Sequence, residues 1–200
     1  MGIEKITLDM LARIMALEER VAKLEDIQKD VITITEEDDE SSELGTKESG
    51  RQKSRNEIMK ILSNKYGYKV RKGNRSEGSG IVASKPGIKQ FNIKISYSKS
   101  YFENVTEDVI CAGWHTLIEK EIDNKKFSFF IFVVADADNE FHYFIFRREE
   151  IPVVFKEKAY DAQKKIHFYF RVKASGEPVE QRETELDMSS HYNNWTIFSM

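Results

Sequence analysis

An almost unbroken apolar segment in the middle of the chain constrains the fold more than any other feature. Residues 127–134 read FSFFIFVV, with one serine among seven apolar side chains. Alternate side chains of a β-strand point to opposite sides of its sheet, so a strand that is apolar throughout needs cover on both faces. The apolar stretch Phe127–Ala135 is also far too short to cross a bilayer, and no membrane partner is expected. The segment therefore predicts a buried strand between two packing layers.

The residues around this strand predict the other elements of the domain. Apolar side chains at helical spacing predict a helix over Asn56–Tyr66, which ends at Gly67. A second helix is expected over Val109–Glu121, where Trp114, Leu117 and Ile118 fall on one side. Further strands are expected at residues 68–70, 81–83, 90–96, 141–146 and 166–172, and the tail at 192–198 is expected to dock on the core. This order predicts an α/β fold with a mixed β-sheet flanked by helices.

The first quarter of the chain has a different pattern. Apolar residues recur at alternating spacings of three and four over residues 3–31, which is the heptad period of a coiled coil. An isolated helix of this length is marginal in water, so we expect a homo-oligomer, a dimer or higher, through residues 3–31. The alternative is that this helix packs on the chain's own domain. Residues 33–53 are acidic and polar and predict a disordered linker. The expected organisation is a coiled-coil oligomerisation helix at 1–32, the linker at 33–53 and an α/β domain at 54–200.

Cysteine usage and the N-terminus bear on the compartment. Cys111 is the only cysteine, so no disulfide can form within the chain. The N-terminus, MGIEKITLDM, lacks a basic region followed by an apolar stretch, so no signal peptide is expected. Both features predict a cytoplasmic protein.

The charge is distributed unevenly along the chain. Residues 51–100 carry 13 Lys and Arg but only 2 Asp and Glu, although the whole chain has a net charge of −3. A basic block in an acidic chain is typical of a surface that faces a polyanion, and nucleic acid is the expected partner. The alternatives are that the acidic N-terminal segment covers the block, or that its loop is a mobile, solvated segment. The candidate nucleic-acid-binding residues bracket two predicted strands and are Lys69, Arg71, Lys72, Arg75, Lys85 and Lys89.

The order of elements over about residues 55–148 carries a family resemblance. A helix with an early acid (Glu57) precedes a β-hairpin, a strand that bears Lys94, an expected helix and the strongly apolar strand. This succession resembles the core of the PD-(D/E)XK nuclease superfamily, in particular its small restriction-endonuclease-like and Mrr-like domains. The resemblance implies a restriction-endonuclease-like fold for residues 54–200 and, as the activity of the family, metal-dependent cleavage of nucleic acid.

The resemblance also implies a set of site residues. Members of the family hold Mg²⁺ with an Asp at the start of one strand and with the acid of an Asp/Glu-x-Lys motif on the next, and the Lys helps to activate water. Lys94 matches the lysine and Glu57 matches an acid that many members carry on the first helix. Asn92 replaces the motif acid, and Ser79-Gly80 stands where the first Asp would fall. The catalytic candidates are therefore Glu57, Asn92 and Lys94. Both central ligand positions, Asn92 and Ser79-Gly80, are neutral. The resemblance therefore implies Mg²⁺ only if the protein is an active enzyme.

Ordinary structural roles compete with these assignments. Lys94 alternates with Phe91, Ile93 and Ile95, as a solvent-facing residue of an amphipathic strand does. Glu57 can instead complement the dipole at the start of its helix. We rank a nucleic-acid-binding protein, with DNA as the expected ligand and a nuclease-like fold that lacks most metal-ligand acids, above two alternatives. These are an active Mg²⁺-dependent endonuclease of a restriction or phage-defence system and a non-catalytic coiled-coil adaptor that binds a protein partner.

Overall fold

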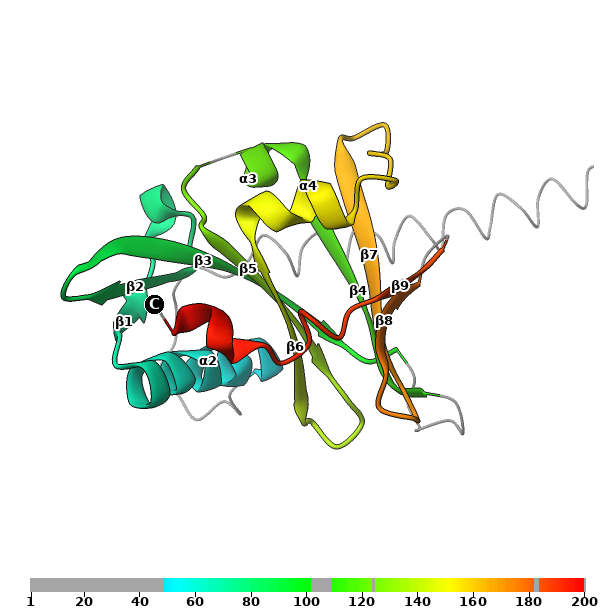
Figure 1. The fold of residues 1–200 in the computed structure, drawn as a ribbon, viewed down its shortest axis with the longest axis horizontal. Coiled ribbons are helices and arrows are strands. Elements are labelled where there is room, and N and C mark those ends of the chain that lie inside the picture. The colour runs from blue at the N-terminus through cyan, green and yellow to red at the C-terminus, as the bar shows by residue number, and fades with distance from the viewer. Residues whose placement is uncertain (1–48, 102–108, 124, 182–183, 200) are drawn as a thin grey trace, which may run out of the picture. The chain divides into compact units, whose positions relative to one another are not determined.

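The computed structural model describes residues 49–101, 109–123, 125–181 and 184–199. The expected coiled coil of residues 3–31 and residues 33–48 of the expected linker lie outside the described residues. The described part is an α/β domain with two β-sheets, one long helix and two short ones (Figure 1). Its helices are α2 (Gly50–Tyr66), α3 (Glu119–Asp123) and α4 (Ile151–Val154), with 3-10 turns at Arg75–Glu77, Arg148–Glu150 and Trp195–Phe198. Its strands are β1 (Lys69–Lys72), β2 (Ile81–Lys85), β3 (Ile88–Lys99), β4 (Val109–Ile118), β5 (Phe129–Ala135), β6 (Phe141–Arg147), β7 (Lys165–Lys173), β8 (Pro178–Gln181) and β9 (Glu185–Asp187).

Helix α2 begins earlier than the sequence predicts. The Ser49 side chain caps it by accepting a hydrogen bond from the backbone N–H of Gln52 at 3.3 Å. The expected linker therefore ends before Gly50, and residues 50–53 belong to the first turns of the helix. The predicted end of the helix is confirmed, because Gly67 adopts the left-handed conformation (φ 70°) that such a cap requires.

The strands of the described residues form two sheets. The large sheet has the order β1-β2-β3-β5-β6, in which β3 and β5 are parallel and the other neighbours are antiparallel. The small sheet has the order β4-β7-β8-β9 and is antiparallel throughout. A mixed sheet in an α/β domain is thus confirmed. The second sheet was not expected.

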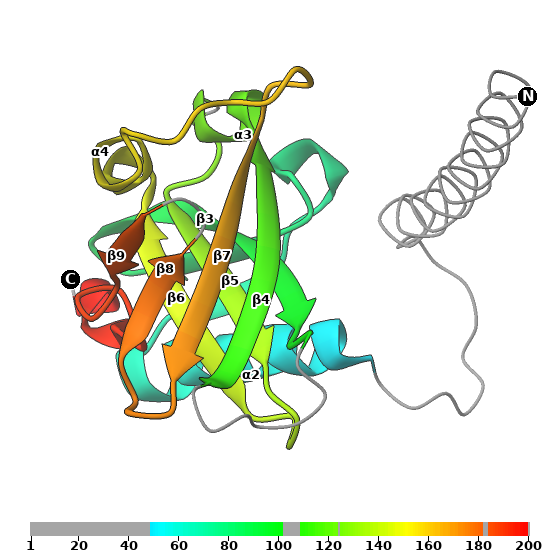
Figure 2. The same ribbon diagram turned by 90° about the vertical axis from the view of Figure 1, so that its right-hand side faces the viewer.

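Strand β5 has apolar cover on both faces, as its sequence predicts. Phe129, Ile131 and Val133 pack in one cluster with residues of α2 and with Phe198. The alternate side chains pack in the other cluster, against the small sheet, and are Phe130, Phe132 and Val134. Figures 1 and 2 show the two covers, with α2 against one side of the large sheet and β4, β7 and β8 against the other. The second face is therefore covered mainly by a sheet, where helices were expected.

The next element that the structure describes after β3 is the strand β4, so the helix expected over Val109–Glu121 is wrong for residues 109–118. Cys111, His115 and Leu117 are buried in the domain, whereas Trp114 is exposed and Thr116 is partly exposed. Gly113 lets β4 approach the large sheet, since a Cβ there would lie 2.6 Å from a methyl carbon of Val134. His115 is fully buried, and its Nδ1 lies 2.9 Å from the Ser96 hydroxyl. Burial lowers the pKa of His115 to about 3, so the imidazole is neutral near pH 7.

The C-terminal tail docks on the core, as expected. Phe198 is fully buried against the α2 side of the large sheet. Its carbonyl oxygen accepts a hydrogen bond from the Tyr68 hydroxyl at 3.0 Å. None of the helices among the described residues has the length and apolar character needed to cross a membrane.

Candidate nucleic-acid interface

Glu57 lies on the α2 side of the large sheet. Its Oε1 accepts a hydrogen bond from the Tyr143 hydroxyl at 2.7 Å, and Tyr143 belongs to the core cluster beneath α2. Burial raises the pKa of Tyr143, and the carboxylate of Glu57 raises it further, so the phenol keeps its proton and remains the donor. Glu57 thus ties α2 to β6.

Asn92 and Lys94 point to the opposite side of that sheet. They alternate along β3 with Phe91 and Ile93, which pack in the α2-side cluster. The sheet therefore separates Glu57 from the other two catalytic candidates. The structure brings together only the two that are neighbours on one strand.

Both side chains on this face have partners within the protein. The Asn92 amide nitrogen donates to the carbonyl oxygen of Glu77 at 3.3 Å. The Lys94 Nζ donates to Glu121 Oε1 at 2.6 Å and lies 5.8 Å from the centre of the Phe127 ring. Glu121 also accepts a hydrogen bond from the backbone N–H of Ile118. Lys94 and Glu121 therefore form an ion pair, in which the Lys94 side chain is 28% exposed and the Glu121 side chain is 24% exposed.

Glu121 is the acid beside Lys94 that the sequence did not reveal. It comes from the short helix α3, which follows β4 directly. The sequence places Glu121 at the end of an expected helix, and no spacing rule relates that position to β3. The one feature of the sequence that could have suggested Glu121 is its position in the connection between β3 and β5, the two parallel strands.

Position 80 cannot carry the acid that the family resemblance implies. A Cβ on Gly80 would lie 2.0 Å from the carbonyl oxygen of Ile93, far inside van der Waals contact. Asn92 turns its amide donor toward Glu77, and Glu121 is paired with Lys94. Within the described residues, no group of three or more His, Cys, Asp or Glu side chains is placed to hold a metal ion. The residues near Lys94 therefore do not fit a Mg²⁺ site.

The basic loop between β1 and β2 is a folded element in this structure. Glu77 accepts two hydrogen bonds from the Arg71 guanidinium, at 2.6 and 2.7 Å, and a third from the backbone N–H of Asn74. The Asn74 side chain in turn accepts from the backbone N–H of Glu77, which completes a capping box. A hydrogen bond from Gly73 N–H to the Gly80 carbonyl closes the loop at 2.8 Å. Arg71 is thus engaged in holding the loop.

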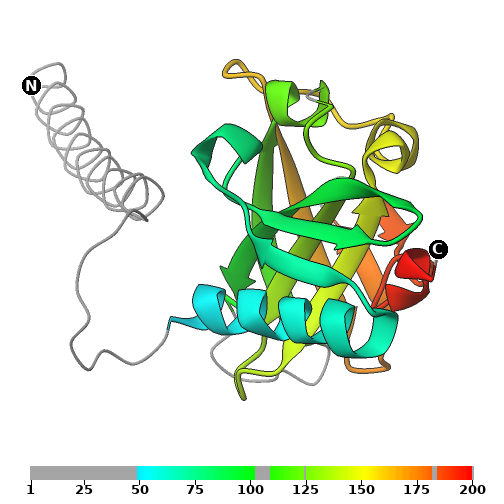
Figure 3. The same cartoon turned by 90° about the vertical axis from the view of Figure 1, so that its left-hand side faces the viewer.

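The other predicted contact residues differ in how far they are available. Lys85 donates to the Tyr66 carbonyl at 3.0 Å and lies over the Tyr68 ring, so it has a structural role as well. Besides Arg71, four of the predicted residues are exposed on β1, on the loop and on β3, and they are Lys69, Lys72, Arg75 and Lys89. Helix α2 adds three exposed lysines, Lys53, Lys60 and Lys65. We call these seven residues the cationic surface. Figure 3 shows α2, β1, β2 and β3 together on one side of the domain.

The Arg71–Glu77 pair predicts a pH dependence of stability. The hydrogen bonds from Arg71 and from the Asn74 backbone lower the pKa of Glu77 from 4.5 to about 2. A pKa that is lowered in the folded state stabilises the protein above pH 4.5, and this stabilisation is lost as the pH falls from about 4.5 to about 2. We expect Glu77→Gln to flatten the fall in melting temperature over this range, measured by circular dichroism. The change is small because the pair faces solvent.

The partner provides the control for this measurement. Arg71→Gln removes the main cause of the lowered pKa and should flatten the same part of the pH profile. A Glu77→Gln variant that keeps the full acid-induced decline would contradict the assignment of that decline to this pair.

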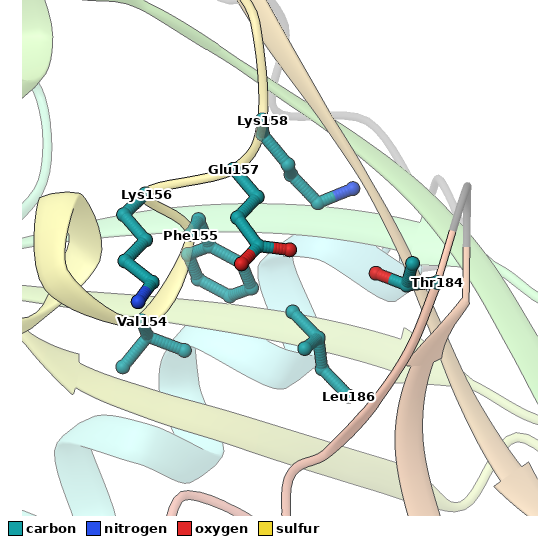
Figure 4. A pocket seen from close by; sticks show the side chains of 7 residues that line it. All are labelled: Val154, Phe155, Lys156, Glu157, Lys158, Thr184 and Leu186. Carbon is teal, nitrogen blue, oxygen red and sulfur yellow. The ribbon is translucent and has the colours of Figure 1, made fainter.

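A small hollow lies beside α4, away from all of these residues. It has a volume of about 200 Å³ and is lined by Val154, Phe155, Lys156, Glu157, Lys158, Thr184 and Leu186 (Figure 4). Lys158 forms an ion pair at 2.7 Å with Glu180, whose side chain is 1% exposed. None of the predicted site residues lines this hollow, and its most buried charge is already paired within the protein. We assign it no ligand.

Searches against protein families, characterised proteins and solved structures find no match to this chain.

Proposed function

We propose that the α/β domain binds nucleic acid through the cationic surface and does not cut it. One observation carries the proposal. Residues 51–100 contain 13 Lys and Arg against 2 Asp and Glu, and both acids, Glu57 and Glu77, accept hydrogen bonds from side chains of the protein itself. Even with Arg71 paired with Glu77 and Lys94 paired with Glu121, the positive charges of residues 51–100 far outnumber the negative ones. Lysine and arginine in such excess are the residues that contact phosphates.

Binding is favoured over cleavage by the surroundings of Lys94. Cleavage by the family that the chain resembles needs carboxylates around a metal ion next to the lysine. Here the nearest acid neutralises Lys94, Gly80 leaves no room for a side chain, and Glu57 is on the other side of the sheet. Lys94 and Asn92 accordingly support the fold beside the cationic surface in this proposal.

The N-terminal heptads extend the proposal to the whole chain. A dimer formed through residues 3–31 carries two copies of the cationic surface on one molecule. Two linked sites bind a long polyanion more tightly than one, because the second contact is intramolecular. Duplex DNA long enough to reach both copies is therefore the ligand of choice for a first test.

The test compares two triple variants of equal charge in the full chain. Lys69, Lys72 and Lys89, all exposed on the cationic surface, are changed to Gln. Each lost phosphate contact reduces the slope of log affinity against log salt by about 0.9 on duplex DNA. We expect binding, measured by fluorescence anisotropy of a labelled duplex, to weaken on the order of tenfold to a hundredfold at low salt.

The control variant carries the same three changes outside this surface. Lys120, Lys156 and Lys164 are exposed on α3 or after α4, and Lys164 is paired with Glu119. Their replacement by Gln should leave the affinity within about twofold, since they make no phosphate contact in the proposal. Equal weakening by both variants, or binding that does not depend on salt, would overturn it. A protein partner that remains bound after nuclease treatment, with no affinity for DNA, would favour the adaptor alternative.

A further inference from the structure

The outer face of the small sheet exposes large aromatic side chains that the core does not use. Trp114 on β4 is 53% exposed and Tyr101, just after β3, is 48% exposed. Together with Tyr169, Arg171 and Gln181 they line an open hollow of about 540 Å³. Leaving a tryptophan this exposed forgoes the stabilisation that its burial would provide. An exposed tryptophan in a cluster of aromatic rings is typical of a binding surface.

The Trp114 ring is held in place although it is exposed. Tyr169 lies directly across from it in the β4–β7 pair, with the two rings nearly parallel (7°) and their centres 5.8 Å apart. The indole N–H of Trp114 donates to His167 Nδ1 at 3.3 Å. His167 Nδ1 is therefore an acceptor, and its ring proton is on Nε2, which lies 2.9 Å from Asp161 Oδ2. The chain of hydrogen bonds fixes the indole before any ligand arrives, which reduces the entropy lost on binding.

Asp161 is in turn held by the backbone. It accepts hydrogen bonds from the backbone N–H groups of Lys165 and Gln163, and these, with the contact to His167, lower its pKa. The carboxylate is ionised near neutral pH and keeps His167 in the orientation that serves Trp114. The support of the ring thus comes from β7 and the turn before it.

Positive charge accompanies the rings on the same face. The outward side chains of β7 alternate from Lys165 through His167 and Tyr169 to Arg171 and Lys173. Lys173 is paired with Glu185 at 2.7 Å, so Lys165 and Arg171 supply the positive charge beside the rings. Arg171 lies in the hollow and donates to the Gln181 side-chain carbonyl at 2.9 Å. Aromatic faces interleaved with cations suit a chain of unpaired bases joined by phosphates, because each base has a π-face and each linkage has a negative charge.

We propose that this face of the small sheet binds single-stranded nucleic acid, with an unpaired base stacked in the hollow at Trp114. A duplex cannot use it, since its bases are already stacked and paired. The inference rests on the proposed function for the nature of the polymer, but it concerns a different surface and a different contact. The cationic surface contacts phosphates, whereas the hollow contacts bases.

The test separates bases from phosphates. The chain has two tryptophans, Trp114 and Trp195, so Trp195→Phe leaves Trp114 as the only tryptophan reporter. This variant is titrated with a twelve-nucleotide oligothymidylate and with an abasic oligonucleotide of the same length. We expect the base-bearing strand to quench Trp114 fluorescence and the abasic strand to leave it unchanged. In otherwise wild-type chain, Trp114→Ala should weaken binding of the base-bearing strand about tenfold, to the affinity of the abasic strand. Trp114→Phe should retain most of the preference for bases.

Each failure has a distinct outcome. If the preference for bases survives Trp114→Ala, or if the abasic strand quenches equally, the stacking site is refuted while phosphate binding stands. If the Lys69, Lys72 and Lys89 triple variant loses no affinity for either strand, the cationic surface is refuted instead. Binding of neither strand would overturn both. A proline-rich peptide that quenches Trp114 when no oligonucleotide does would assign the hollow to a protein partner and refute this proposal.

Discussion

Gly80→Asp is expected to destabilise the domain by about 3 kcal/mol or more and to give no metal-dependent nuclease activity. The Cβ of any residue at position 80 would lie 2.0 Å from the Ile93 carbonyl oxygen. That oxygen belongs to the backbone of β3, so it cannot move aside as a flexible side chain can. The Gly80 carbonyl also accepts the hydrogen bond from Gly73 that closes the basic loop, so a shift at position 80 would disturb the loop too. Urea unfolding of the full-length variant measures the loss.

A second glycine provides the control for steric conflict. Gly87, in the turn between β2 and β3, has φ 78°, but a Cβ there would meet nothing within 4 Å. Gly87→Ala should cost only about 1–2 kcal/mol, the strain of a left-handed backbone. Gly80→Ala should cost more than this, because its clash is with backbone. A Gly80→Asp variant as stable as wild type that also cleaved DNA with Mg²⁺ would contradict both the fold at β2 and the proposal of binding without cutting.

The elements that the sequence predicted well are those with one dominant local signal. The continuous apolar run at β5 can be satisfied only by cover on both sides, and its side chains do divide between two clusters. The end of α2 was predictable because Gly67 is suited to the left-handed cap. In both cases the chemistry of a few neighbouring residues decides the conformation.

Strand β4 was mispredicted as a helix because its apolar residues fit both the period of a helix and the alternation of a strand. Trp114, Leu117 and Ile118 have helical spacing, whereas Cys111, Gly113, His115 and Leu117 alternate as in a strand. The large sheet decides between the two. Gly113 has its close contact with Val134 across the sheets, and such a contact is invisible in a single sequence. Trp114 is outside because of this alternation, so the exposed aromatic face could not be foreseen.

The candidate site depends even more on tertiary placement. Alternation along β3 already places Lys94 on the face opposite Phe91 and Ile93. The alternation does not say which face of the large sheet α2 will cover. In the structure α2 covers the face of Phe91 and Ile93, so the sheet lies between Glu57 and Lys94. The partner of Lys94, Glu121, lies 27 positions away on a short helix. The basic character of residues 51–100 was visible in the composition, but the use of Arg71 to hold Glu77 was not.

Phe170→Ala is expected to destabilise the domain by about 4 kcal/mol. Phe170 is fully buried on the inward face of β7, where the two sheets meet. Its ring centre lies 4.4 Å from that of Phe144 and 5.0 Å from that of Phe132, both on the large sheet. Truncation leaves a cavity that rings anchored on two sheets cannot readily fill, so little of the lost contact is recovered. Urea unfolding with an unchanged m-value would show a loss of stability without a change of fold.

The adjacent residue makes this experiment a test of the β7 register. Tyr169 points outward beside Trp114, so Tyr169→Ala should cost about 1 kcal/mol, the scale of a cross-strand aromatic pair. A slip of one residue in the β4–β7 pairing would exchange the two faces of β7 and reverse the order of the two effects. Equal or reversed costs would therefore contradict the pairing of Trp114 with Tyr169, and with it the aromatic hollow on which single-strand binding depends. A large cost for Phe170 and a small one for Tyr169 would place the rings at Trp114 outside the core, where a base can reach them.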